Sequence, residues 1–285
     1  MTELPSGDNY KELLERREAI NATLDGLRPF SPAHTLNEAM GYVLFPGGKR
    51  LRSIMTLIAG EAFGQRTETL LTTAAAIELL HTASLVFDDL PYMDDTRERH
   101  GKPALHVKYS PDLAVLCGHS LVSLALYLPT QAGIKDDAVR RIVAELALCI
   151  GPKGMAAGQA EDLCGQQGVN AENACRVATC KTSPLFRAAA YCGAVAAGAS
   201  EEHASSLREY GMRLGTAYQI ADDLRDQERE DNPERSTNVV AALGTDGAVH
   251  AFNREVDLAK VSLNGIPRKN DLLDFAEAIR SFCHA

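Results

Sequence analysis

Two short clusters of aspartates carry the side chains that are best suited to chemistry. The first, DDLPYMDD at residues 88–95, follows an apolar segment, AAAIELLHTASLVF, in which Glu78 is the only charged residue. This segment is predicted to be a buried helix, and a carboxylate removed from water without a positive partner costs several kcal/mol. We therefore expect the cluster at the end of this helix to bind cations.

The second cluster, Asp222, Asp223 and Asp226, follows another largely apolar run, MRLGTAYQIA. Helix residues that are four positions apart lie about 40° apart on one face, so Asp222 and Asp226 could bridge a divalent cation. Mg²⁺ suits them because it takes carboxylate oxygens, keeps several waters and completes its shell with substrate phosphates. The alternative for such a cluster alone is a solvated helix end.

The first cluster needs a bend before its aspartates can act together. Asp88 and Asp94 would lie roughly 120° out of phase on an unbroken helix. Pro91 lies between them and cannot continue the helical hydrogen bonding. A break at this proline is expected to return Asp94 toward Asp88, and the two clusters could then share a set of metal ions.

Basic residues could bind an anionic ligand of those metals. GGKRLR at 47–52 is a glycine turn that opens a helix and brings cations close together. Backbone N–H groups at a helix start, together with such cations, suit a phosphate, although a charged surface helix start is the alternative. The P-loop pattern GxxxxGK[ST] is absent, which argues against a nucleotide triphosphatase. His81 precedes Asp88 on the same helix face, and further basic residues are Arg97, Arg99, His100, Lys102 and Lys181.

The elements that must position these groups are all predicted to be helices. The chain has 285 residues, of which 45% are hydrophobic, and we expect one all-α domain over residues 1–285. The helix at 171–198 is expected to be interrupted around Thr182-Ser183-Pro184. Apolar periodicity and breaker residues predict helices at 8–25, 35–45, 51–64, 68–90, 113–129, 135–150, 152–167, 171–198, 202–224, 246–262 and 270–283.

Composition excludes several other classes. The net charge of −9 and the lack of a long basic run argue against a nucleic-acid-binding protein. Seven cysteines without a C-x-x-C pair favour reduced thiols and a cytoplasmic location. The polar N-terminus resembles neither a signal peptide nor a membrane anchor, and no segment approaches 18 uninterrupted apolar residues, so no membrane span is expected.

Five segments, taken together, resemble the conserved blocks of one family and occur in its order. The family is the trans-isoprenyl diphosphate synthases, and the bacterial geranylgeranyl and farnesyl diphosphate synthases are the most similar members. The resemblance implies an isoprenoid-synthase helical bundle with a central cavity, a homodimer, and a 1′-4 condensation of isopentenyl diphosphate with an allylic diphosphate. The segments are GGKRLR (47–52), HTASLVFDDLPYMDD (81–95), GQAEDL (158–163), KTSPLFRAA (181–189) and YQIADDLRD (218–226).

The resemblance also implies a role for each matching position. Direct ligands of three Mg²⁺ ions would be Asp88, Asp94 and Asp222, supported by Asp89, Asp95, Asp223 and Asp226. The allylic diphosphate, or its departure, would involve Arg99, Lys181, Thr182, Gln219 and Arg235. Isopentenyl diphosphate would contact Gly48, Lys49, Arg52, His81 and His100. The allylic C–O bond would break, the isopentenyl double bond would attack the carbocation, and the released diphosphate would accept the proton.

Three positions depart from the family pattern. His100 replaces the second arginine of an Arg-Arg pair, so its charge depends on pH. His119 stands where the family has the aspartate of a Gly-Asp pair, and Arg235 replaces a lysine. None of these changes removes a metal ligand. The property that they are most expected to alter is the affinity for isopentenyl diphosphate.

Product length is predicted from the residues that precede the first aspartate motif, because in this family they line the tunnel for the growing chain. Ala83 and Ser84, the fifth and fourth residues before Asp88, are small, and a bulky floor could follow at Leu80 or Ile77. Small residues here favour geranylgeranyl diphosphate (C20), made from dimethylallyl, geranyl or farnesyl diphosphate. Farnesyl diphosphate (C15) is the alternative product.

Two other functions are compatible with an aspartate-rich motif. A class I terpene cyclase would not need the GGKRLR loop, and its second metal site usually reads as an Asn/Asp–Ser/Thr–Glu triad. A regulatory subunit of a heteromeric synthase would be expected to have degraded aspartate motifs, whereas both are intact in this chain.

Overall fold

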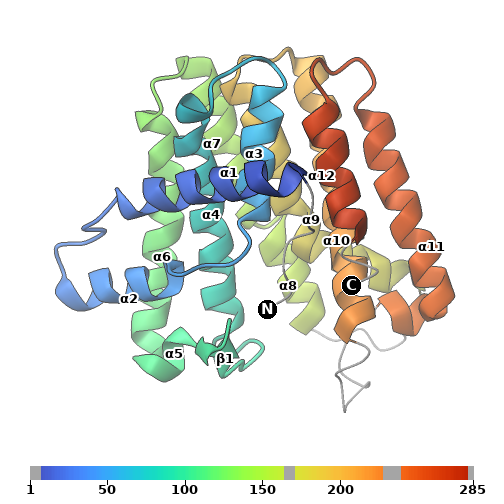
Figure 1. Ribbon diagram of the computed structural model, residues 1–285. Coiled ribbons are helices and arrows are strands. Elements are labelled where there is room, and N and C mark those ends of the chain that lie inside the picture. Colours follow the sequence, from blue (N-terminus) through green and yellow to red (C-terminus); the bar gives the residue numbers. More distant parts are fainter. Residues whose placement is uncertain (1–7, 164–170, 227–238, 282–285) are drawn as a thin grey trace.

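The computed structural model describes residues 8–163, 171–226 and 239–281. Most helix axes run nearly parallel, whereas α1 and α2 lie across one side of the bundle (Figure 1). The helices are α1 (Asp8–Asp25), α2 (His34–Leu44), α3 (Leu51–Glu61), α4 (Thr67–Asp88), α5 (Leu105–Lys108), α6 (Pro111–Tyr127), α7 (Asp136–Ile150), α8 (Met155–Leu163), α9 (Ala171–Ala196), α10 (Glu201–Asp226), α11 (Val239–Ser262) and α12 (Asn270–Ser281), with a 3₁₀ helix at Leu128–Gln131. The predicted all-α fold is confirmed.

The sequence did not predict the hairpin that connects α4 to α5. Strands β1 (Glu98–Arg99) and β2 (Lys102–Pro103) pair antiparallel, with Glu98 opposite Pro103. His100 and Gly101 form its turn and have positive φ angles of 54° and 73°. The hairpin lies at the end of the bundle where α4 ends (Figure 1).

Helix α4 is the central helix of the bundle and packs against α3, α6 and α9. It is apolar on all sides, as expected for a helix enclosed by others. Both α4 and the segment Pro111–Gln131 are long and apolar enough to cross a membrane, but 72% of an 18-residue apolar stretch of α4 is buried inside the bundle. The core helix of a folded bundle can have the same length and composition, so α4 is accounted for by the fold.

The predicted interruption of the helix at 171–198 is wrong, because α9 runs through Pro184 without a break. The two residues before the proline are tied to α10: Thr182 donates a hydrogen bond to Gln219, and the hydroxyls of Ser183 and Thr216 lie 3.0 Å apart. Close packing supports this turn, since a Cβ on Gly215 of α10 would lie 2.6 Å from the Ser183 Cα. These contacts offset the helical hydrogen bond that proline removes.

The other predicted helices agree with the structure to within a few residues, with one exception. Helix α11 begins at Val239, earlier than predicted, and bends at Gly244, where φ is 71°. Residues 227–238, between α10 and α11, lie outside the described part of the chain. Within the described part of the chain, Cys117, Cys149 and Cys192 are buried thiols.

Candidate active site

The first aspartate cluster forms a folded turn at the end of α4. The helix stops at Asp88, and after Pro91 the chain turns back, so that the Asp94 N–H donates to the Asp88 carbonyl at 2.9 Å. The predicted return of Asp94 toward Asp88 is therefore confirmed. Asp94 is exposed and accepts a hydrogen bond from Gln159 Nε2 of α8 at 3.1 Å.

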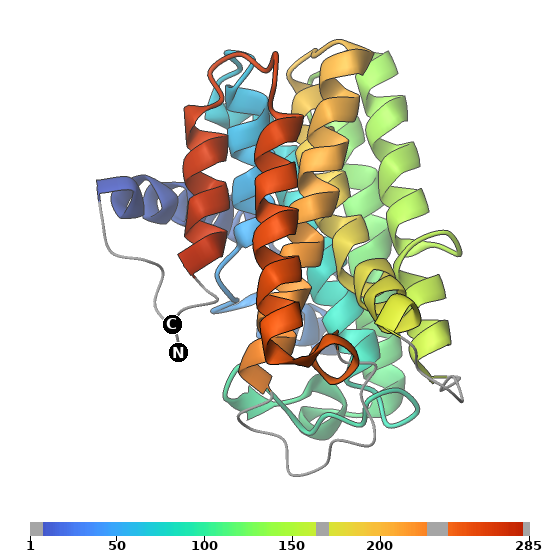
Figure 2. The ribbon, with the colours of Figure 1, turned by 90° about the vertical axis from the view of Figure 1, so that its right-hand side faces the viewer.

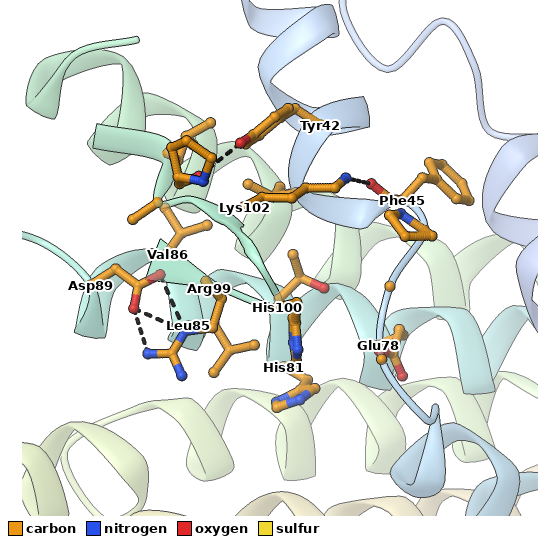
Figure 3. A pocket seen from close by; sticks show the side chains of 18 of the residues that line it. Tyr42, Phe45, Glu78, His81, Leu85, Val86, Asp89, Arg99, His100 and Lys102 are labelled. Atoms are coloured by element: carbon orange, nitrogen blue, oxygen red, sulfur yellow. Dashed lines mark hydrogen bonds and ion pairs between the residues drawn. The ribbon is translucent and has the colours of Figure 1, made fainter. Parts of the chain in front are cut away.

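Asp89 points to a different side of α4. Its carboxylate is 4% exposed and accepts a hydrogen bond from Arg99 Nε of the hairpin at 3.0 Å (Figure 3). Arg99 and Asp89 were assigned to the allylic diphosphate and to metal support, respectively. In this structure they bind each other and fix the hairpin to α4.

The glycine loop between α2 and α3 lies beside the hairpin and brings Lys49 toward the second aspartate cluster. Gly48 faces the hairpin, because a Cβ built on it would lie 3.7 Å from His100 Cε1. Lys49 is half-buried, and burial followed by the nearby Arg225 lowers the pKa of its amine, while Asp222 raises that pKa. Lys49 thus lies within electrostatic reach of the second aspartate cluster.

Arg52 packs against two neighbouring aromatic rings, whose centroids are 5.4 Å apart. Its guanidinium lies 4.5 Å from the Phe186 ring centroid and 5.8 Å from that of Tyr218, and NH1 is 3.4 Å from His81 Nε2. Burial, followed by the charges of Arg52 and Arg50, holds the pKa of His81 well below its usual value. A neutral His81 can accept from Arg52, and Arg52 Nε is buried without a partner among the described residues, so it can donate to a ligand.

The second aspartate cluster divides in a similar way. Asp222 forms an ion pair with Arg225 on the next turn of α10. Asp223 is almost buried and accepts hydrogen bonds from Gln219 Nε2 and from the Val239 backbone N–H, both at 2.9 Å. Through Gln219 this chain of hydrogen bonds reaches Thr182, so Asp223 ties the start of α11 to α10 and α9. The side chains of Asp226 and Lys181, and all of Arg235, lie outside the described residues.

The two clusters lie at the same end of the bundle, where α4 and α10 end beside the hairpin (Figures 1 and 2). In the described ranges, no three His, Cys, Asp or Glu side chains are close enough to form a metal site by themselves. The donor set still fits Mg²⁺, which takes carboxylate oxygens, because Asp94 is exposed and Asp88 and Asp222 are only half-buried. Gln159 Oε1, buried beside Asp94 without a partner in the described chain, could accept a hydrogen bond from a metal-bound water.

A pocket lies on the other side of α4, between α2, the glycine loop and the hairpin. It encloses about 620 Å³ including its open mouth. Its walls include the apolar side chains of Phe45, Leu85 and Val86 (Figure 3). The pocket brings together four of the predicted binding residues: Gly48, His81, Arg99 and His100. His119, by contrast, is an exposed residue of α6.

Sequence reasoning missed two residues that contact the aspartates. Arg225 follows Asp222 by three positions, and this helical spacing could have indicated the ion pair. Gln159 is 65 positions from Asp94 in the chain, and nothing in the sequence indicates their contact. Glu78 was seen only as an isolated charge, yet its carboxylate forms a buried ion pair with Arg50.

Comparisons with known proteins agree on one family. The sequence pattern described as polyprenyl synthetase matches residues 33–236. The chain is similar to geranylgeranyl pyrophosphate synthase 11, chloroplastic, from Arabidopsis thaliana, with 38% identity over 75% of this chain and 62% of the relative. A geranylgeranyl pyrophosphate synthase of Catharanthus roseus is 34% identical, again over 75% of this chain and 61% of the relative. The chain thus spans about three fifths of the length of these curated relatives.

Solved structures cover the chain more completely. An FPP/GFPP synthase from Zymomonas mobilis superposes with a TM-score of 0.88 at 28% identity, covering 95% of this chain and 99% of that one. A geranyltransferase from Legionella pneumophila superposes with a TM-score of 0.87 at 27% identity and 97% coverage of both chains.

Proposed function

Because this chain belongs to the polyprenyl synthetase family, we propose that it is a prenyltransferase that condenses isopentenyl diphosphate with an allylic diphosphate. One observation carries the proposal: α4 bears His81 beside Arg52 and, two turns later, Asp88 bonded to Asp94. A basic site and an acidic site therefore adjoin on a single rigid helix. Two diphosphates bound at these sites would be held close together, which favours reaction between them.

The residues have separate tasks in this proposal. Lys49, Arg52 and the Gly48 backbone would bind isopentenyl diphosphate, with neutral His81 keeping Arg52 in place. Asp88, Asp94 and Asp222 would hold Mg²⁺, which, when bound, supplies positive charge that stabilises a diphosphate leaving group. The surrounding helices would orient the hydrocarbon groups of the two substrates and keep water away from the carbocation. The released diphosphate would accept the proton, so no side chain acts as the base.

We propose geranylgeranyl diphosphate as the product. Ala83 and Leu80 are completely buried, and the Ser84 hydroxyl donates to its own helix at the His81 carbonyl, 2.8 Å away. No aromatic ring occupies the fifth or fourth position before Asp88, and several relatives are named geranylgeranyl pyrophosphate synthases. The farnesyl product is the alternative, favoured by a structural neighbour named as an FPP/GFPP synthase.

The activity is tested by incubating the protein with isopentenyl diphosphate, Mg²⁺ and each of the C5, C10 and C15 allylic diphosphates. Consumption of isopentenyl diphosphate distinguishes a synthase from a terpene cyclase, which would use the allylic diphosphate alone. A regulatory subunit assayed without its catalytic partner would consume neither substrate.

We also propose that the protein is a homodimer formed through α6. Only 39% of an 18-residue apolar stretch within Pro111–Gln131 is buried. Val115, Leu116 and Tyr127 are 47%, 55% and 55% exposed. Apolar side chains gathered on one exposed helix face are typical of an interface.

The proposal also includes three Mg²⁺ ions per site, one domain over residues 1–285 and a cytoplasmic location. Equilibrium dialysis would count the bound ions.

A further inference from the structure

One face of α4 forms a wall of the pocket and has a carboxylate at each end. Glu78, Thr82, Leu85 and Asp89 follow the helical spacing i, i+4, i+7 and i+11, and all of them line the pocket. Each carboxylate binds an arginine from a different segment. Glu78 pairs with Arg50 of the glycine loop, and Asp89 pairs with Arg99 of the hairpin.

Arg50 is fully engaged inside the protein. Its NH1 lies 2.7 Å from Glu78 Oε1, its Nε 3.0 Å from Asn21 Oδ1, and its NH2 2.6 Å from the Leu44 carbonyl oxygen. The other Glu78 oxygen accepts a hydrogen bond from the Ser53 hydroxyl at 2.6 Å. The two side chains are 2% and 3% exposed. Arg50 lines the pocket but differs from Lys49 and Arg52, because each of its guanidinium nitrogens already binds a group of the protein.

The backbone of the glycine loop rests directly on this guanidinium. A Cβ on Gly47 would lie 2.0 Å from Arg50 NH2, and the Gly47 φ of 75° also favours glycine. Lys102 Nζ of the hairpin holds the start of the loop by donating to the Phe45 carbonyl at 2.7 Å. The shape of the loop thus depends on the position of the buried arginine.

We propose that Glu78 and Arg50 are positioning residues that shape the loop over Gly47, Gly48 and Lys49 for the diphosphate of isopentenyl diphosphate. This inference rests on the proposed function. The ion pair keeps the Gly48 N–H and the Lys49 amine in place before the ligand arrives, which lowers the cost of binding. The aspartate turn begins at Asp88, beyond the part of α4 that carries Glu78. Loosening the Glu78–Arg50 pair should therefore weaken the binding of isopentenyl diphosphate and spare the binding of the allylic diphosphate.

The test compares Glu78→Gln with a matched control, Glu145→Gln. Glu145 is also a buried carboxylate, 5% exposed, and binds two arginines, Arg187 and Arg208, but it lies on α7 away from the loop. We expect Glu78→Gln to raise the KM for isopentenyl diphosphate about tenfold, while kcat and the KM for the allylic substrate stay within about twofold. Glu145→Gln should leave all three unchanged.

Gly47→Ala provides a second variant, because it forces a Cβ onto the guanidinium and should raise the same KM selectively. An unchanged KM for isopentenyl diphosphate in folded Glu78→Gln, or equal losses in Glu78→Gln and Glu145→Gln, would overturn the inference. If Glu78→Gln does not fold, an unchanged KM in Gly47→Ala overturns it. Titration calorimetry with inorganic diphosphate adds a test that does not need turnover: Glu78→Gln should weaken binding about tenfold. A wild-type protein that consumes no isopentenyl diphosphate contradicts the proposed function, whereas the calorimetry still decides the inference.

Discussion

The backbone N–H of Asp94 lies 2.9 Å from the carbonyl oxygen of Asp88 and closes the turn that ends α4. These aspartates are six positions apart, a spacing that would separate them on a continuous helix, but the turn brings them together. The acidic site is therefore built on a short, folded segment attached to a buried helix. Its position follows directly from the end of α4.

Replacing Asp94 with asparagine should lower kcat by about 10²–10³, the usual loss when one group that stabilises developing charge is removed. Asparagine keeps the size and the contact with Gln159 but removes the charge that would hold Mg²⁺. Steady-state kinetics at saturating Mg²⁺ measures the effect. Asp137→Asn, a neutralised aspartate exposed on α7, is the control and should retain full activity; equal activity of both variants would contradict the metal role.

His100 should make the binding of isopentenyl diphosphate depend on pH. Burial, followed by Arg99, lowers the pKa of His100 below its usual 6.5, so the imidazole is neutral at pH 8 and gains its charge only under acidic conditions. The protonated form attracts diphosphate, and the KM for isopentenyl diphosphate should therefore rise as pH increases from 5.5 to 8.

The matched variant is His100→Arg, whose charge does not titrate in this range. Its KM should fall severalfold below that of the wild type at pH 8 and approach the wild-type value at pH 5.5. His203→Arg, near the opposite end of α10, controls for added charge. Parallel pH profiles of KM for wild type and His100→Arg would exclude this role.

Replacing Ala83 with tyrosine should shorten the product, because the ring would fill space beside the growing chain. Ala83 is fully buried, and overpacking costs roughly 1–3 kcal/mol of stability, so folding should be checked by circular dichroism. Product chromatography measures the chain length. Ala144→Tyr on the exposed face of α7 should leave the product unchanged, and an unchanged product in folded Ala83→Tyr would show that the tunnel is elsewhere.

Introducing a charge at Leu116 should separate the proposed dimer into monomers. Leu116→Glu places a carboxylate on the exposed apolar face of α6, where a second chain would have to bury it. Light scattering after size exclusion gives the mass of each species. Leu148→Glu on α7 makes the same change at a similarly exposed leucine and should remain dimeric; a dimeric Leu116→Glu would place the interface on another surface.

Removing Glu78 should strongly destabilise the fold. Glu78→Ala leaves Arg50 buried without a counter-charge, which costs about 3–5 kcal/mol, whereas replacing both residues by methionine should restore most of this loss. Urea unfolding measures the free energies. The double variant should nevertheless bind isopentenyl diphosphate poorly, and normal binding by this variant would mean that the ion pair serves stability alone.

Local rules predicted much of this structure. The spacing of Asp88, Pro91 and Asp94 was enough to predict the turn, because a proline cannot continue a helix and the chain beyond it must bend. The same rule gave the wrong result at Pro184, where α10 packs so closely on α9 that tertiary contacts keep the helix continuous. Local spacing carries no information about such a contact.

The same limit explains which site residues were missed. Glu78 and Arg50 are 28 positions apart, and Gln159 and Asp94 are 65 apart, so these contacts exist only after the helices pack. Asp88 and Asp89 point in different directions because they are consecutive helix residues, but the ion pair of Asp89 with Arg99 forms only because the hairpin packs beside α4. Sequence patterns identified the charged groups, and the fold determined which of them bind each other.

The most direct test of the account is a stoichiometric assay with farnesyl diphosphate, isopentenyl diphosphate and Mg²⁺. The account predicts that one inorganic diphosphate is released for each isopentenyl diphosphate consumed, that geranylgeranyl diphosphate accumulates, and that removing Mg²⁺ with a chelator stops both. Failure to consume isopentenyl diphosphate with this primer and with the C5 and C10 primers would contradict it.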